Sequence, residues 1–206
     1  LVDKSNDSPL VDVNLLFYTG AAADPAGKKG LAALTASMIA KGGSESRSYK
    51  EIQKALYPMA GSFYAQLDKE MISFRGRVHK DNAEAWYDII SDQLLNPGWR
   101  EDDFSRIKKE QIDGIKSGLK ASNDEELGKE VLYHELYQGH PYESYNYGDL
   151  SDLESITLDD VKAFYRAQLT QAKLNVGISG QMPKSVKAKL MADLRQLPEG
   201  DETRLS

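Results

Sequence analysis

The chain has 206 residues, of which 40% are hydrophobic and 28% charged, as in an ordinary globular protein of one large domain or two small ones. Its net charge is −6, and 26 basic residues are scattered among 32 acidic ones, which disfavours a nucleic-acid surface because such a surface needs clustered Lys and Arg. The absence of cysteine rules out disulfides, thiolate metal sites and a cysteine nucleophile, and the longest apolar runs, such as residues 13–18, are far too short to span a bilayer.

The two ends of the sequence resemble cuts within a longer chain. It opens with LVDKSNDSPL, without an initiator Met or the apolar segment of a signal peptide, and it stops at DETRLS without a clear structural ending. We therefore expect a fragment of a longer protein.

The first half of the chain alternates strand patterns with helical ones. Apolar and polar residues alternate over 11–20, which predicts a strand, and after residue 30 the apolar residues recur at helical spacing. Ser48 with Glu51, and Asp81 with Glu84, match the capping box that starts a helix. The expected order is a strand at 11–20, a small-residue loop at 21–29, a helix from 30 to a stop at 42–43, a helix from 48 to 61, strands at 63–68 and 71–79, and a helix from 81 to 96–98.

The second half is mainly helical. A long apolar stripe begins at Asp102, and Ser122 with Glu125 predicts a fresh helix start that divides this region into two helices. The second of these should run to about residue 138, followed by a turn-rich segment at 139–155, a helix from Thr157, a strand at 173–179 and a final amphipathic helix that includes residues 186–197. With no repeat and no convincing linker, residues 1–206 predict one α+β domain, a sheet with helices packed mainly on one face.

Several local motifs occur in a fixed order along the whole chain. They are GLAALTASMIAKGG at residues 30–43, SRSYKEIQKAL at 46–56, a strand pair, LNPGW at 95–99, a long helix, HPY at 140–142, and ITLDDVKAFY at 156–165 before a strand that ends in glycine. This order resembles the pitrilysin (insulinase) family of zinc metallopeptidases, which includes the mitochondrial processing peptidases. The resemblance implies a half-shell domain with a mostly antiparallel sheet.

The same resemblance implies that the metal site is missing. Active members carry His-x-x-Glu-His on the helix that matches residues 30–43, and those three positions fall here on Ala33, Ala36 and Ser37. The family's third ligand, a glutamate on the later long helix, falls on Gly114. None of these four aligned positions offers an imidazole or a carboxylate, whereas an open zinc site normally keeps three protein ligands. The resemblance therefore implies no catalytic residue and no metal bound by this chain, and the small residues at 33 and 36 would let their helix lie close to the sheet.

The three histidines of the sequence have more ordinary interpretations. His134 begins a His-Glu pair without a second histidine, and with Glu130 it forms an i,i+4 pair that favours a helix-surface contact over a metal site. His140 precedes Pro141, which favours a structural turn. His79 lies at the end of a predicted strand and should be exposed.

Two further groups of side chains could carry function. The neighbouring acids at 68 and 70, and at 102 and 103, are better read as solvated charge than as a catalytic pair. Five tyrosines gather over residues 133–147, and they could pack at the edge of the core or form a wall of a peptide- or partner-binding surface. Those tyrosines are Tyr133, Tyr137, Tyr142, Tyr145 and Tyr147.

The resemblance also implies a function. Family members pair copies of this domain into half-shells around a peptide chamber, with the metal in one copy. We therefore expect a non-catalytic chamber-wall and scaffold domain whose partner is a homologous family domain that holds the zinc. The alternatives are a structural or binding subunit with no role in proteolysis, and an enzyme with an unrelated site.

A peptide substrate, if one binds, is expected along the strand formed by Phe63, Tyr64, Ala65 and Gln66, because active relatives add substrate to this edge. Packing of Phe63 and Tyr64 on opposite faces of the sheet is the competing interpretation. Relatives suggest the bacterial periplasm, or the mitochondrial matrix as the alternative compartment.

Overall fold

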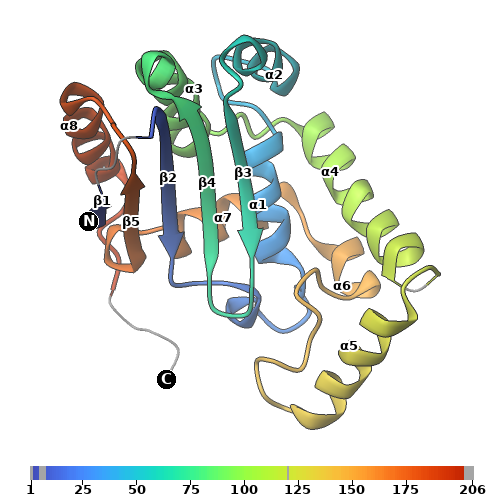
Figure 1. Cartoon of the computed structure of the whole chain (residues 1–206). Coiled ribbons are helices and arrows are strands. Elements are labelled where there is room, and N and C mark those ends of the chain that lie inside the picture. Colours follow the sequence, from blue (N-terminus) through green and yellow to red (C-terminus); the bar gives the residue numbers. More distant parts are fainter. Residues whose placement is uncertain (1, 5–7, 120, 202–206) are drawn as a thin grey trace.

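The computed structural model of the chain describes residues 2–4, 8–119 and 121–201 (Figure 1). Its centre is a sheet of order β1-β5-β2-β4-β3, in which β2 pairs antiparallel with both β4 and β5, and β3 pairs antiparallel with β4. Only the β1–β5 pair is parallel, so the expected mostly antiparallel sheet is confirmed. The strands are β1 Val2–Lys4, β2 Leu10–Phe17, β3 Ser62–Leu67, β4 Ile72–His79 and β5 Leu174–Ser179.

Eight α-helices and one π-helical segment accompany the sheet in the described part of the chain. They are α1 Leu31–Lys41, α2 Tyr49–Leu56, α3 Ala83–Leu95, α4 Glu101–Asp113, the π-helical segment Gly114–Leu119, α5 Asp124–Leu136, α6 Leu150–Ser155, α7 Leu158–Gln168 and α8 Lys184–Asp193. Figure 1 shows α1 and α7 behind the strands, with the opposite face of the sheet free of helices, as the sequence predicted.

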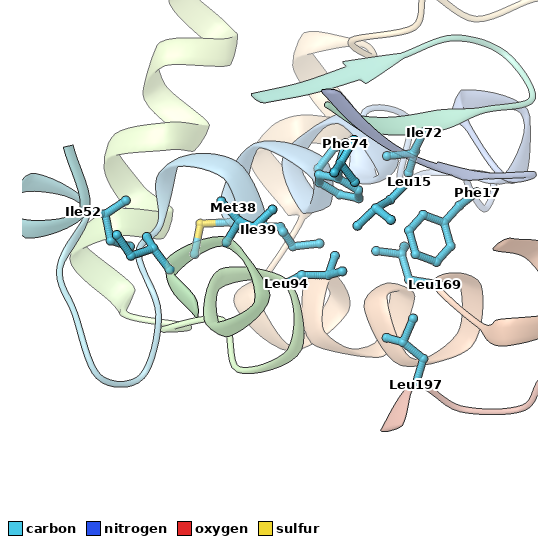
Figure 2. Packing of buried hydrophobic residues seen from close by; sticks show 14 of the residues in the cluster. Leu15, Phe17, Met38, Ile39, Ile52, Ile72, Phe74, Leu94, Leu169 and Leu197 are labelled. Atoms are coloured by element: carbon cyan, nitrogen blue, oxygen red, sulfur yellow. The ribbon is translucent and has the colours of Figure 1, made fainter. Parts of the chain in front are cut away.

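The core lies between this covered face of the sheet and the helices. Strand β2 alternates buried and partly exposed residues, so Leu15 and Phe17 point toward the helices. They pack with Phe74 of β4 and with Ile39 of α1 (Figure 2). Helix α1 is apolar on nearly all sides, as expected of a helix covered by other elements. It therefore lies buried at the centre of the helical layer.

Two of the predicted helix starts are confirmed in full. The Ser48 side chain accepts the backbone N–H of Glu51, while the Glu51 carboxylate accepts the backbone N–H of Ser48. Thr157 and Asp160 form the same reciprocal pair at the start of α7. Both boxes work because each is complete within four residues and needs no distant partner.

Two other predicted starts are wrong. Residues 80–82 form a short 3-10 turn, so α3 begins at Ala83 without a side-chain cap, and the backbone N–H of Asp81 is taken by Nδ1 of His79. Helix α5 is capped by Asn123, whose side chain accepts the N–H of Glu126 at 3.1 Å. The Ser122 hydroxyl instead donates back to carbonyls of the preceding π-helical segment, so it is not free to cap.

Three elements were not predicted. Strand β1 has three residues and forms through its parallel pairing with β5, so no alternating pattern could reveal it. Helix α6 lies inside the segment expected to be turn-rich and buries a single side chain, Leu153. The π-helical turn directly after α4 interrupts what the apolar stripe suggested was one regular helix. Such turns are rare and are frequent at functional sites.

Candidate functional site

The start of α1 is fixed from the loop before it. The carboxylate of Asp24 accepts the backbone N–H groups of Gly30 and Ala32, each at 2.7 Å. Gly30 adopts a left-handed conformation with φ of 100°, which suits glycine best. Asp24 is 5% exposed, and its burial raises the pKa of the carboxyl to about 6. These contacts fix the first turn of α1. They thereby help to position Ala33, Ala36 and Ser37, which lie within the next two turns.

A cavity of about 260 Å³ opens between α1 and α4, and we name it the α1–α4 cavity. Two of the four aligned positions, Ser37 and Gly114, line it from opposite helices. Its other lining residues are Lys41, Ile107, Glu110, Gln111, Ile115, Tyr145 and Tyr147. The structure thus brings together two positions that only the family resemblance had connected.

Gly114 stands where α4 passes into the π-helical segment. It is exposed, and a side chain added there would meet no atom within 4 Å. The neighbouring carboxylate of Asp113 is taken up by an exposed ion pair with Lys109 and is not among the residues that line the cavity. The space at position 114 is therefore open, and Asp113 does not fill it.

The groups around the α1–α4 cavity do not suit a zinc ion. The lining offers one carboxylate, Glu110, together with the ammonium group of Lys41, which would repel a cation. Within residues 2–4, 8–119 and 121–201, no three His, Cys, Asp or Glu side chains gather closely enough to hold a metal ion. The cavity has the space of a site but lacks the ligands.

A second cavity of about 200 Å³ lies between α1 and the edge strand β3, and we name it the α1–β3 cavity. Ala33 and Ala36, both at most 3% exposed, form part of its wall on α1 together with Ser37. Phe63 and Ala65 line it from β3. The small side chains on α1 do not fill the space between the helix and the strand. The cavity that remains has room for a side chain.

Phe63 and Tyr64 of β3 have different surroundings. The Phe63 ring stacks on Phe74 at 5.9 Å on the helical side of the sheet, whereas Tyr64 is 47% exposed. Gln66 is exposed and lines a third cavity of about 340 Å³ beside the β3–β4 turn, together with Ala65. The two aromatic rings therefore divide between the two faces of the sheet.

The backbone of β3 is open on its outer side. β3 is the last strand of the sheet, and the N–H of Asp68 bonds the carbonyl of Met71 across the hairpin turn. In an antiparallel ladder bonded pairs alternate with unbonded ones, so Tyr64 and Gln66 bond toward β4. The backbone groups of residues 63, 65 and 67 consequently point to the open edge.

Lys41, which sequence reasoning did not select, and Tyr147, one of the five tyrosines that it did, line both the α1–α4 and the α1–β3 cavity. Tyr147 lies in a loop held to α1 by Gln111, whose side-chain amide donates to the carbonyls of Gly30 and Tyr147. The neighbouring Tyr145 is partly buried, which raises its pKa to about 12 and keeps the phenol neutral. The tyrosine-rich segment was the only local signal for this wall.

The histidines lie outside both cavities. Nδ1 of His134 lies 3.4 Å from the Glu143 carboxylate rather than against Glu130. Nδ1 of His140 accepts the backbone N–H of Tyr142 at 3.1 Å, as in the structural turn expected there. His79 is partly exposed and lies at the end of β4.

Comparison with known families decides the affiliation. The family described as insulinase, peptidase family M16, matches residues 1–149, well over half of the chain. The chain belongs to the insulinase family. It is 26% identical over 171 residues to the mitochondrial-processing peptidase subunit beta of Dictyostelium discoideum, a match that spans 78% of this chain and 35% of the relative. It is 22% identical over 197 residues to an uncharacterized zinc protease of Rickettsia bellii, with coverages of 95% and 47%.

Solved structures of the insulinase family share the fold. A crystal structure described as a peptidase M16 inactive domain from Pseudomonas fluorescens superposes with a TM-score of 0.84 at 24% identity, over 96% of this chain and 48% of that one. Pitrilysin gives 0.82 at 18% identity, over 98% of this chain and 22% of pitrilysin. A protease from Helicobacter pylori gives 0.80 at 16% identity, with coverages of 99% and 49%.

The chain therefore spans about half or less of the length of the relatives it matches. At these identities the structural likeness establishes the fold, which is the half fold predicted from sequence. In the described part of the chain, no helix combines the length and the apolar composition needed to cross a membrane.

Proposed function

We propose that this insulinase-family domain is a non-catalytic wall and scaffold of a peptidase assembly, in which a homologous domain carries the zinc and cleaves the peptide. The observation that carries the proposal is the α1–α4 cavity, which has Ser37 and Gly114 at the aligned positions. A serine hydroxyl and a glycine cannot replace the imidazole and carboxylate ligands of a catalytic zinc site.

The geometry around β3 supports a retained contact with peptide. Backbone groups of residues 63, 65 and 67 point to an open sheet edge, and backbone pairing with an added strand needs no particular side chain. The α1–β3 cavity beside this edge is floored by Ala33 and Ala36, so it could receive an apolar side chain of the added strand. A domain without metal could therefore still hold an extended peptide for its partner.

The known relatives are consistent with this division of labour. One similar solved structure is described as an inactive domain of the family, and one similar protein is named as a subunit. They support the idea that this fold serves as a part of larger assemblies.

Reconstitution would test the proposal. The chain would be mixed with a family domain from the same genome that has an intact His-x-x-Glu-His motif, and cleavage of an unfolded peptide would be followed with and without chelator. We expect no cleavage by the chain alone, and chelator-sensitive cleavage by the mixture that exceeds that of the partner alone.

Two results would contradict this expectation. Chelator-sensitive cleavage by the chain alone would overturn the non-catalytic assignment. Equal activity of the partner with and without the chain, or the absence of any such partner, would favour the structural subunit with no role in proteolysis.

A further inference from the structure

Several apolar side chains of helix α5 point to solvent and not to the core of the domain. Val131, Leu132 and Leu136 are 55%, 56% and 68% exposed, and no residue of the helix is buried. An amphipathic helix on a globular protein normally turns such a stripe toward the core. We name these three residues the α5 apolar face.

The side of α5 that faces the domain is mainly polar, since its partly buried residues are Glu126, Leu127 and Glu130. Glu130 is partly buried and lies within electrostatic reach of Lys69 at the tip of the β3–β4 hairpin. The Lys69 ammonium in turn donates to the carbonyl of Ser144 at 2.5 Å. Both groups are partly buried, which raises the pKa of the Glu130 carboxyl and lowers the pKa of the Lys69 ammonium. Glu130 and Lys69 thus lie on the inner side of the helix, whereas the α5 apolar face is directed to solvent.

The position of α5 leaves this stripe accessible. Figure 1 shows α5 at the lower right, beyond α4 and apart from the layers formed by the sheet and its covering helices. Leu132 and Leu136 lie four residues apart on one side of the helix, with Gly128 four residues earlier. A side chain at Gly128 would meet no atom within 4 Å, so a partner could approach the helix backbone closely there.

We propose that the α5 apolar face is the docking surface for a second insulinase-family domain. The inference rests on the proposed function, because it names where the metal-bearing partner attaches. Contiguous exposed apolar residues with a polar rim are typical of protein interfaces.

Two observations favour this occupant. The similar chains from Pseudomonas fluorescens and Helicobacter pylori are about twice as long as the matched region, since this chain covers 48% and 49% of them, so the same fold occurs there beside further protein. The α5 sequence DEELGKEVLYHEL has five carboxylates against one lysine. Two such helices from identical copies would repel each other, so the partner should bring an apolar surface with a basic rim.

Substitution of the exposed leucines tests the surface. The variants Leu132→Glu and Leu136→Glu would be compared with the unsubstituted chain by calorimetry, for binding to a family domain from the same genome that has an intact His-x-x-Glu-His motif. We expect each to raise Kd about 10-fold or more, because a carboxylate would be buried in an apolar contact. The matched control is Tyr57→Glu, since Tyr57 is an 88% exposed apolar residue at the end of α2, and it should leave Kd within about twofold.

Folding can be separated from binding in the same proteins. Because both leucine side chains lie largely in solvent, the helical circular dichroism and the thermal midpoint of the two variants should match those of the unsubstituted chain. Sedimentation of the chain alone should show a monomer. A dimer that Leu132→Glu dissociates would make a second copy the occupant and overturn the proposal.

The remaining outcomes distinguish this inference from the proposed function. Unchanged affinity of both well-folded variants would mean that the partner docks elsewhere, which removes the α5 apolar face while the proposed function stands. Absence of binding by the unsubstituted chain would remove both.

Discussion

Ser37 on α1 and Gly114 at the end of α4 line one cavity of about 260 Å³ from opposite sides. If these are the positions where active relatives hold zinc, ligands placed there should recreate a metal site. The test is the variant Ala33→His, Ala36→Glu, Ser37→His and Gly114→Glu. We expect it to gain zinc affinity, measured by calorimetry, because positions 33 and 37 are one helical turn apart and Gly114 has open space for a side chain.

Peptidase activity should remain low in that variant. The residues that orient metal-bound histidines are not rebuilt, and each such partner is worth about 10- to 100-fold. Ala33 and Ala36 are buried, so their enlargement should cost about 1–3 kcal/mol per site in the free energy of unfolding. The matched control carries Glu at 118 in place of 114, where there is also open space. A well-folded variant that binds zinc no better than this control would show that the ligand positions lie elsewhere.

The unsubstituted chain should bind no catalytic zinc. The α1–α4 cavity offers one carboxylate and a lysine, a set that favours neither the affinity nor the geometry of such a site. Elemental analysis of protein purified without a metal-affinity tag is the direct measurement. Near-stoichiometric zinc would contradict the prediction, and His134 with Glu143 would be the first pair to replace.

Proline in the edge strand should weaken peptide binding. Ala65→Pro removes an N–H that points to the open edge, while the bonds of Tyr64 and Gln66 to β4 remain. We expect a clear rise in Kd for an unfolded fluorescent peptide, measured by anisotropy, with little change in circular dichroism. The control Ala65→Val keeps the amide and should bind nearly as well as the unsubstituted chain. If the proline variant binds equally well, β3 is not the peptide site.

Local signals in the sequence revealed most of the architecture. The capping boxes at Ser48 and Thr157 were readable because both partners lie within one helical turn. The cap at Asn123 was misplaced by one residue because the neighbouring Ser122 hydroxyl turns back to the π-helical segment, which propensities do not reveal. Strand β1 depends entirely on pairing with β5, a contact between the two ends of the chain.

The site was predictable only in part, for the same physical reason. The aligned positions on α1 follow from one helical motif, but their relation to Gly114 came from family resemblance. Lys41 and Tyr147 enter the cavities through the packing of α1 against a loop far along the chain. The cap provided by Asp24 spans a Gly/Pro-containing loop, so no fixed spacing marks it.

Asp24 should make the stability of the domain depend on pH. Burial raises its pKa from the ordinary value of 3.8 to about 6, against the opposing effect of the N–H groups of Gly30 and Ala32. Between these two values the folded protein holds a proton on Asp24 that the unfolded chain has lost, so the contribution of Asp24 to the free energy of unfolding should fall as pH rises from about 4 to about 6 and then level off. The carboxyl group alone should account for about 1–3 kcal/mol of this change, since one pKa unit corresponds to about 1.4 kcal/mol.

Urea unfolding of the chain and of Asp24→Asn across that range isolates the contribution, because the amide does not titrate and retains only one of the two acceptor oxygens. The free energy of unfolding of the unsubstituted chain minus that of Asp24→Asn should therefore fall between about pH 4 and 6. If this difference in the free energy of unfolding stays constant or rises over that range, the two backbone N–H donors outweigh burial and hold the carboxylate ionised.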